Sequence, residues 1–164
     1  LAAHSTLTLA TERDGKPLET GPFARLKDHP VLAALAAEYG NGLFVRLTAR
    51  VIDAALGPSR LRALADLLPA APSAPAEPRR ETGVGVGSIE NARGRLVHRV
   101  EIESGAISRW QVVAPTEWNF HPQGALAQGL AGAAESEDVL TVAVPTLVAA
   151  LDPCVPCRVS FGSA

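Results

Sequence analysis

Two cysteines three positions apart form the clearest chemical group in this 164-residue chain. Cys154 and Cys157 enclose Val155 and Pro156, and the sequence holds no other cysteine. Two intervening residues let the chain turn, so both thiols can face one centre, where thiolates bind soft or borderline metals. The same spacing suits a redox dithiol. A structural zinc site usually needs four ligands, and the histidines show no ligand spacing. The pair alone therefore leaves three interpretations open: a metal site, a redox dithiol and two cysteines without a chemical role.

Two further residues could hold a small anion. Arg93 precedes an alternating segment, and its guanidinium presents a fixed fork of donors. Thr116 follows Pro115 at the end of another such segment, where its hydroxyl and the loop N–H groups could form a donor cluster. The ordinary alternatives are a surface arginine and a simple exit from a strand, with Trp118 packed on the core.

Two other features favour structural explanations. The run of alternating glycines over residues 83–87 lacks both the GxGxxG pattern and the Lys-Ser/Thr of a P-loop, so we interpret it as a flexible loop. His98 lies on the apolar side of its segment, where a hydrogen-bonded core histidine is a commoner finding than a metal ligand.

The first half of the chain is predicted to be mainly helical. Asp28 should cap a helix with Pro30 in its first turn, and the residues at 40–42 should end it. Leu43, Leu47, Val51 and Ala55 are expected to form the buried face of a second helix. The other elements expected here are a weak strand at 6–10, a turn at 14–17, a helix break at 57–58 and a helix over 60–68 capped by Ser59.

The second half is predicted to contain a β-hairpin. Four prolines within residues 69–78 exclude a helix or central strand and indicate a linker or surface loop. Residues 94–103 alternate in polarity, Ser104-Gly105 is a turn signal, and 106–114 would return as the second strand. We expect irregular chain at 115–122, helices at 123–133 and 138–151 with Pro145 forcing a late start or kink, and a loop with a short strand-like end over 152–164.

Composition narrows the classes of protein. With 47% hydrophobic and 20% charged residues, the chain suits one globular domain over 1–164, comprising a helical part at 1–68, a loop at 69–79 and a hairpin and cysteine part at 80–164. The formal net charge of −2 gives no reason to expect nucleic acid or anionic membrane as a partner. No apolar run reaches the ~20 residues of a membrane helix.

The ends and the cysteine usage suggest a compartment. The first residues show no basic stretch followed by an apolar one, as a signal peptide would. Two cysteines suit a reducing compartment, so we expect a cytoplasmic protein. The sequence starts at Leu1 and contains no methionine, which we read as a fragment or as methionines missing from the string.

Three motifs follow one another in a specific order: Glu90-x-x-Arg93-Gly94-x-Leu96-x-His98, then Gln111-Val112-Val113-Ala114-Pro115-Thr116-x-Trp118-Asn119, and Asp152-Pro153-Cys154-x-x-Cys157. In this order they resemble the C-terminal half of the nickel–iron hydrogenase large subunit, closely over residues 83–160 and loosely over 18–50. An upstream segment, Thr20-Gly21-Pro22-Phe23-Ala24-Arg25-Leu26, is also similar. The resemblance implies an α+β fold, mostly helical with a small antiparallel sheet, that matches part of the large-subunit fold.

The resemblance also implies roles for particular residues. In that family the last CxxC binds the metal centre, so Cys154 and Cys157 would be metal ligands. The iron carries two cyanides and one carbon monoxide, and the cyanides accept hydrogen bonds from an arginine and a hydroxyl. Carried over, Arg93 and Thr116, with the adjoining Pro115, would bind the Fe(CN)2CO unit. Whether nickel binds is not predicted.

Departures from the family pattern point away from catalysis. The four thiolates of a working large subunit include an N-terminal CxxC, whereas this sequence has two cysteines. Ser160 stands where the family's CxxCxxH ending has histidine, and Glu117 stands where threonine is common. These features resemble the HupK/HoxV-type uptake-hydrogenase accessory proteins, which are truncated relatives of the large subunit.

The resulting prediction is a non-enzymatic scaffold or transient carrier of the Fe(CN)2CO unit. Its expected partners are the hydrogenase large-subunit precursor and maturation factors or chaperones. Three alternatives remain: a fragment of a catalytic large subunit, a metal-free interaction module and a dithiol redox protein. The carrier interpretation requires residues 91–94, 115–119 and 152–157 to meet within a few ångströms.

Overall fold

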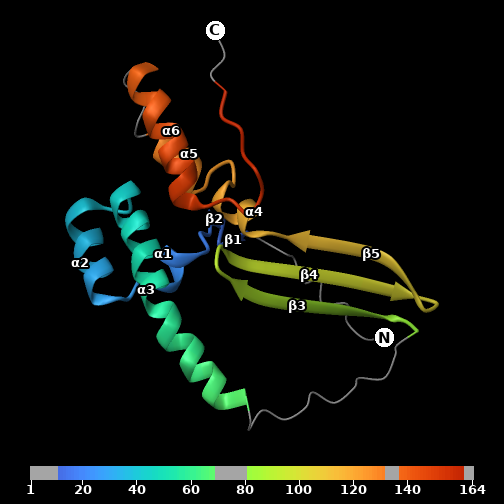
Figure 1. The fold of residues 1–164 in the computed structure, drawn as a ribbon. Helices are drawn as coiled ribbons and strands as arrows, with labels where there is room; N and C mark the ends of the chain where they lie inside the picture. The colour runs from blue at the N-terminus through green and yellow to red at the C-terminus, as the bar shows by residue number, and fades with distance from the viewer. Residues whose placement is uncertain (1–10, 69–80, 132–136, 161–164) are drawn as a thin grey trace. The chain divides into compact units, whose positions relative to one another are not determined.

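A computed structural model describes residues 11–68, 81–131 and 137–160 of the chain. It confirms the predicted class, a mainly helical α+β chain with small antiparallel sheets (Figure 1). The strand expected at 6–10 and the proline-rich segment at 69–78 lie outside these residues. The elements are β1 (Glu12–Arg13), β2 (Lys16–Pro17), α1 (Pro22–Arg25), α2 (Pro30–Tyr39), α3 (Leu43–Leu67), β3 (Gly83–Asn91), β4 (Gly94–Glu103), β5 (Ala106–Val113), α4 (Pro115–Asn119), α5 (Ala125–Ala131) and α6 (Glu137–Leu151).

The contacts divide the chain into two compact units. The first comprises the described parts of Leu1–Gly21, Val86–Arg99 and Gln111–Ala164, and the second comprises those of Pro22–Gly85 and Val100–Trp110. The prediction of a single domain stays a prediction. None of the helices within 11–68, 81–131 and 137–160 has the length and apolarity needed to cross a membrane.

The second unit buries a small core between α1, α2 and α3. α2 begins at Pro30 and ends before Gly40, as predicted, but His29 rather than Asp28 precedes its first turn. The buried residues of α3 are Val45 and Ala49, while Leu47 and Val51 of the predicted face are exposed. An α-helix has 3.6 residues per turn, so side chains spaced four residues apart do not line up along the helix axis. Over three such steps the side-chain direction rotates by about 120° around the helix, and the predicted face therefore turns away from the core.

α3 continues through Gly57 and Pro58, where a break is predicted. The prediction of a separate helix over 60–68 is therefore wrong. Ser59, expected as its cap, instead donates its hydroxyl to the carbonyl of Leu56. A proline removes one helical hydrogen bond, but the flanking turns remain connected. Arg60 contacts Asp53 across the break, which ties the two halves of α3 together.

An ion-pair network fastens α1 to α3. Asp53 accepts hydrogen bonds from Arg25 at 2.7 Å and from Arg60 at 2.6 Å, and its side chain is 16% exposed. Burial of this carboxyl acts to raise its pKa, but the hydrogen bonds and charges of the two arginines outweigh that effect and lower the pKa.

The lowered pKa of Asp53 predicts an acid-sensitive contribution to stability. The folded state favours the carboxylate, so this contribution is present above the unfolded pKa near 3.8 and is lost as pH falls through the folded pKa. Asp53→Asn should lower the free energy of unfolding by roughly 1 kcal/mol at pH 7. Chemical denaturation from pH 7 to pH 2 should show the difference between wild type and variant shrinking with acid. A pH-independent difference would contradict the prediction.

β3, β4 and β5 form a three-stranded sheet in that order, with successive strands antiparallel (Figure 1). The hairpin of β4 and β5 around Ser104-Gly105 is confirmed. The prediction of a flexible loop at 83–87 is wrong, because those residues belong to β3. Glycine at alternate positions lowers strand propensity, yet pairing with β4 prevails over that local preference.

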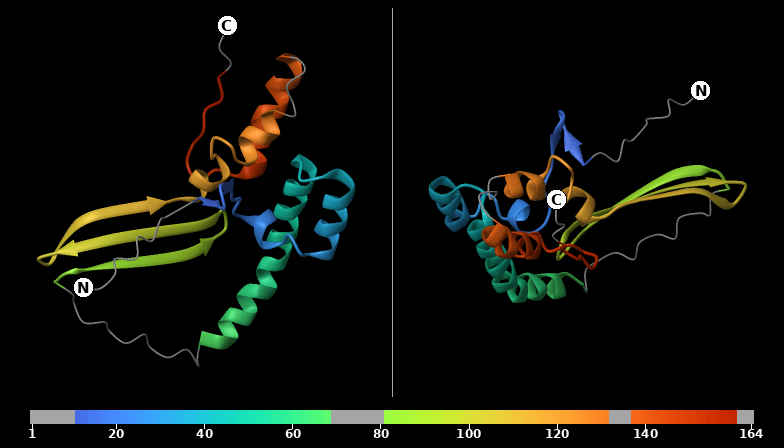
Figure 2. Two further views of the ribbon diagram at one scale, coloured as in Figure 1. Left: turned by 180° about the vertical axis from the view of Figure 1, so that it is seen from behind. Right: turned by 90° about the horizontal axis from the view of Figure 1, so that it is seen from above.

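The remaining helices belong to the first unit. α5 and α6 lie side by side in both views of Figure 2 and match the predicted helices at 123–133 and 138–151. α5 begins at Ala125, two residues later than predicted, and residues 132–133 of its predicted range lie outside the described residues. α6 passes through Pro145. Residues 115–119, predicted as irregular, form the short helix α4. The strand-like end expected in 152–164 is not found within its described part, 152–160.

Candidate functional site

Arg93 lies in the tight turn between β3 and β4. The Asn91 side-chain oxygen accepts hydrogen bonds from the backbone N–H groups of Arg93 at 2.9 Å and Gly94 at 3.1 Å. Asparagine side chains commonly stabilise turns in this way. The turn places the Arg93 side chain outside the sheet ladder, half exposed, where it can serve as a donor.

An N-terminal segment packs against this turn. The Thr20 hydroxyl accepts the backbone N–H of Arg95 at 2.8 Å. Gly94 has φ +134°, and a Cβ placed there would lie 2.4 Å from Thr20 Cγ2. A Cβ on Gly21, at φ +103°, would lie 2.9 Å from the Arg93 carbonyl oxygen. Only glycines permit this approach, so both sides of the contact depend on residues without a side chain.

Thr116 is held by α4, which begins directly after β5. Pro115 is buried at the first helical position, where its missing N–H costs nothing. The Glu117 carboxylate accepts the backbone N–H of Ala114, and the Glu117 N–H donates to the Ala114 carbonyl at 3.0 Å. These contacts resemble half of a capping box and give Glu117, unusual for this motif, a local role.

The cysteine segment begins where α6 ends. Asp152 adopts a left-handed conformation at φ +49°, and its N–H still donates to the Val148 carbonyl at 3.1 Å. A residue in this conformation commonly ends a helix, and Pro153 cannot continue it. The chain therefore turns sharply away from α6 just before Cys154.

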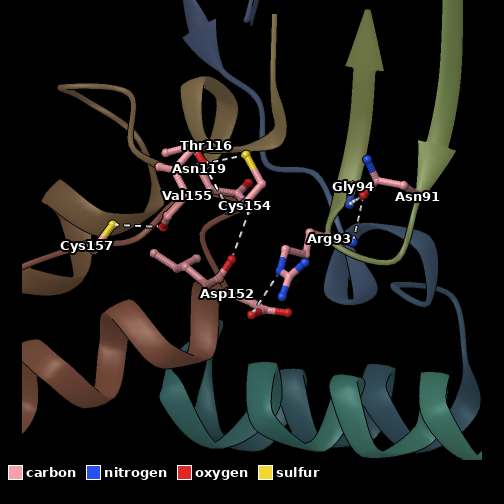
Figure 3. Close-up of polar contacts among 10 residues, drawn as sticks. Asn91, Arg93, Gly94, Thr116, Asn119, Asp152, Cys154, Val155 and Cys157 are labelled. Carbon is pink, nitrogen blue, oxygen red and sulfur yellow. Dashed lines mark hydrogen bonds and ion pairs between the residues drawn. The ribbon is translucent and has the colours of Figure 1, made fainter.

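These segments meet in the first unit, as Figure 3 shows. The Thr116 hydroxyl oxygen accepts the Cys154 backbone N–H at 3.1 Å and lies 2.9 Å from Cys154 Sγ. Arg93 Nε lies 3.4 Å from Asp152 Oδ1. Arg93 and Thr116 therefore both contact the predicted segment at 152–157, Arg93 through Asp152 and Thr116 through Cys154. The roles expected for Arg93, Thr116 and the cysteines stay predictions.

Cys157 is placed differently from Cys154. Both thiols are free, but Cys154 is half-buried whereas Cys157 is exposed. Cys157 Sγ lies 3.7 Å from the carbonyl oxygen of Val155, and Figure 3 shows it away from Thr116 and Arg93. Within residues 11–68, 81–131 and 137–160, no group of three or more His, Cys, Asp or Glu side chains is arranged to hold a metal.

Comparison with known proteins identifies the family. A model of the nickel-dependent hydrogenase family matches residues 41–160, which is most of the chain. The chain belongs to the nickel-dependent hydrogenase family. This confirms the resemblance found in the sequence, and the matched region contains Arg93, Thr116 and both cysteines.

Relatives within this family include accessory proteins. The chain is 37% identical to the hydrogenase expression/formation protein HupV of Azotobacter chroococcum mcd 1, over 90% of this chain and 39% of that protein. It is 34% identical to the hydrogenase expression/formation protein HoxV of Cupriavidus necator, over 98% of this chain and 42% of that protein. The chain thus spans about two fifths of these relatives.

The fold agrees with solved members of the nickel-dependent hydrogenase family. The structure of a reduced, active Ni-Fe-Se hydrogenase from Desulfomicrobium baculatum matches with a TM-score of 0.70 and 25% identity. The match covers 87% of this chain and 35% of the other. The prediction that the chain resembles part of the large-subunit fold is confirmed.

Sequence reasoning missed three residues that build the site. The sequence predicts Thr20 and Asn119 only as members of family motifs, and it predicts no role for Asp152 beside the cysteines. Asn119 is 3% exposed and accepts the Thr20 N–H at 2.9 Å, across 99 residues of sequence. No local pattern indicates such a pairing. The only sequence signal is the place of Asn119 directly after Trp118 in the second family motif, a position that ends helix α4.

Proposed function

We propose that this chain acts as a hydrogenase maturation accessory protein that carries an Fe(CN)2CO unit as cargo. The observation that carries the proposal is that Thr116 contacts Cys154 while Arg93 contacts the nearby Asp152, in a chain similar to hydrogenase expression/formation proteins. Ser160 supports an accessory role, because it replaces the histidine found in the ending of catalytic subunits.

The donor set suits such a cargo. Thiolates are good ligands for iron, and cyanide nitrogens are anionic acceptors that need hydrogen-bond donors. Arg93 contacts Asp152 through Nε, and its guanidinium carries further N–H donors. Thr116 places a hydroxyl beside the Cys154 sulfur. Cys157 is exposed, so packing does not hold its side chain away from a second ligating position.

The proposed chemistry is ligand exchange rather than catalytic turnover. Cys154 and Cys157 would hold the iron, while Arg93 and Thr116 would orient its cyanides. A recipient large-subunit precursor that offers more thiolates would then take the iron unit. Two thiolates suit a carrier because a weaker ligand set allows release. We propose a cytoplasmic setting, where thiols remain reduced, with maturation factors as donors.

Infrared spectroscopy on anaerobically purified protein tests this function. Protein made in cells that contain the cyanide-delivery machinery should show bands of iron-bound carbon monoxide and cyanide. Thr116→Val should shift the cyanide bands because one donor is lost, while Thr48→Val on α3, whose hydroxyl donates to Phe44, should leave them unchanged. Reduced, folded protein without such bands would overturn the carrier function and favour a metal-free interaction module.

A further inference from the structure

A buried asparagine connects all the segments that build the site. Asn119 lies at the end of α4, three residues after Thr116. Its side-chain oxygen accepts the Thr20 N–H at 2.9 Å, and its Nδ2 donates to the Leu151 carbonyl at 3.4 Å. Asn119 thus contacts the segment under the Arg93 turn and the last residue of α6.

The contacts form a closed ring. Thr20 accepts the Arg95 N–H beside the Arg93 turn. Asn119 joins Thr20 to Leu151, and Asp152 follows Leu151 and returns to Arg93 at 3.4 Å. Because Asn119 and Thr116 share α4, a shift of Asn119 would move the hydroxyl that holds Cys154.

We propose that Asn119 is a positioning residue that sets Cys154 against Thr116, and Asp152 against Arg93, without touching the cargo. This inference rests on the proposed function for its biological meaning. Its physical basis is the burial of Asn119, which is 3% exposed, and its two backbone partners. A buried amide that satisfies one donor and one acceptor fixes both in place, since losing either leaves a buried group unpaired.

Thiol alkylation in the iron-free, reduced full chain tests this role. Peptide mass spectrometry gives separate iodoacetamide rates for Cys154 and Cys157. In the wild type Cys154 should react more slowly, because its sulfur is half-buried and contacts Thr116. Asn119→Asp keeps the acceptor for Thr20 but turns the donor facing Leu151 into an oxygen. The Cys154 rate should then rise about tenfold, the scale of one lost hydrogen bond, with the Cys157 rate unchanged.

The matched control is Asn41→Asp, which introduces the same charge at an exposed position before α3 and should leave both rates unchanged. A merely structural effect of Asn119→Asp would lower the melting temperature and leave the ratio of the two rates unaltered. An unaltered ratio in folded Asn119→Asp protein would overturn the proposal. The assay contains no iron, so its failure differs from failure of the carrier function, which the infrared bands report.

Amide hydrogen exchange keeps the proposal testable if the variant does not fold. In the wild type, the Thr20 and Cys154 amides donate to Asn119 and to Thr116, respectively. If α4 connects them, both should open in one cooperative step with the same denaturant dependence. Opening of the Cys154 amide while that of Thr20 stays protected would overturn the proposal.

Discussion

Replacing Cys154 by serine is expected to abolish binding of the iron unit. A hydroxyl is a far poorer ligand for iron than a thiolate, and Cys154 is the thiol that lies beside Thr116. Loss of an outer hydrogen-bond partner alone lowers metal affinity 10–100-fold, so loss of a ligand should exceed about 100-fold. Iron per chain in anaerobically purified protein, measured together with the carbon monoxide and cyanide bands, gives the result.

Cys157→Ser provides the comparison for the second ligand. Its thiol is exposed and away from Thr116, so the substitution should leave the fold unchanged while the iron is lost as in Cys154→Ser. Iron content and hydrogenase maturation that survive both substitutions would contradict the carrier function. That outcome would favour the interaction module, with the cysteine pair as an inherited feature.

Gly94→Ala is expected to be the most destabilising single-methyl substitution in the first unit. The added Cβ would lie 2.4 Å from Thr20 Cγ2 and 2.9 Å from the backbone nitrogen of Gly21, at a φ of +134°. Backbone strain and overpacking together should cost roughly 2–5 kcal/mol. For a chain of this size, each kcal/mol lowers the melting temperature by about 2–4 °C.

Two other glycines serve as controls for this substitution. Gly105→Ala introduces strain at φ +76° with no atom within 4 Å, and so isolates the backbone cost. Gly85→Ala on β3 meets no neighbour within 4 Å and should be close to neutral. Thermal unfolding of the three variants should rank Gly94→Ala lowest. A melting temperature equal to that of Gly105→Ala would show that the segment under the turn yields to the added methyl group.

Elements with local signals were predictable from the sequence. The helix from Pro30 and the hairpin of β4 and β5 have clear start and turn residues, and the structure has both. Predictions from local signals are wrong where contacts with distant residues determine the secondary structure. Gly57 and Pro58 do not break α3, which the Asp53–Arg60 ion pair spans, and the alternating glycines form β3 because they pair with β4.

The candidate site divides in the same way. The order of the motifs predicts that the Arg93 turn and Thr116 both lie near the cysteine segment. This prediction comes from the resemblance to hydrogenases, because the residue types alone do not show which distant segments meet. The pairing of Asn119 with Thr20 could not be predicted, because it joins a side chain to a backbone N–H in a distant segment. The position of Cys157 also lay beyond prediction, since a CxxC motif does not fix the side-chain directions of its two cysteines.

The separation of 99 positions between Thr20 and Asn119 has a consequence for the nascent chain. A ribosome adds about 5–20 residues per second, so roughly 5–20 s separate the synthesis of these two partners. Throughout that interval the Thr20 amide lacks its acceptor; Thr116 is made only three residues before the interval ends, and Cys154 is made after it. Loading of the proposed cargo would therefore follow translation of the cysteine segment.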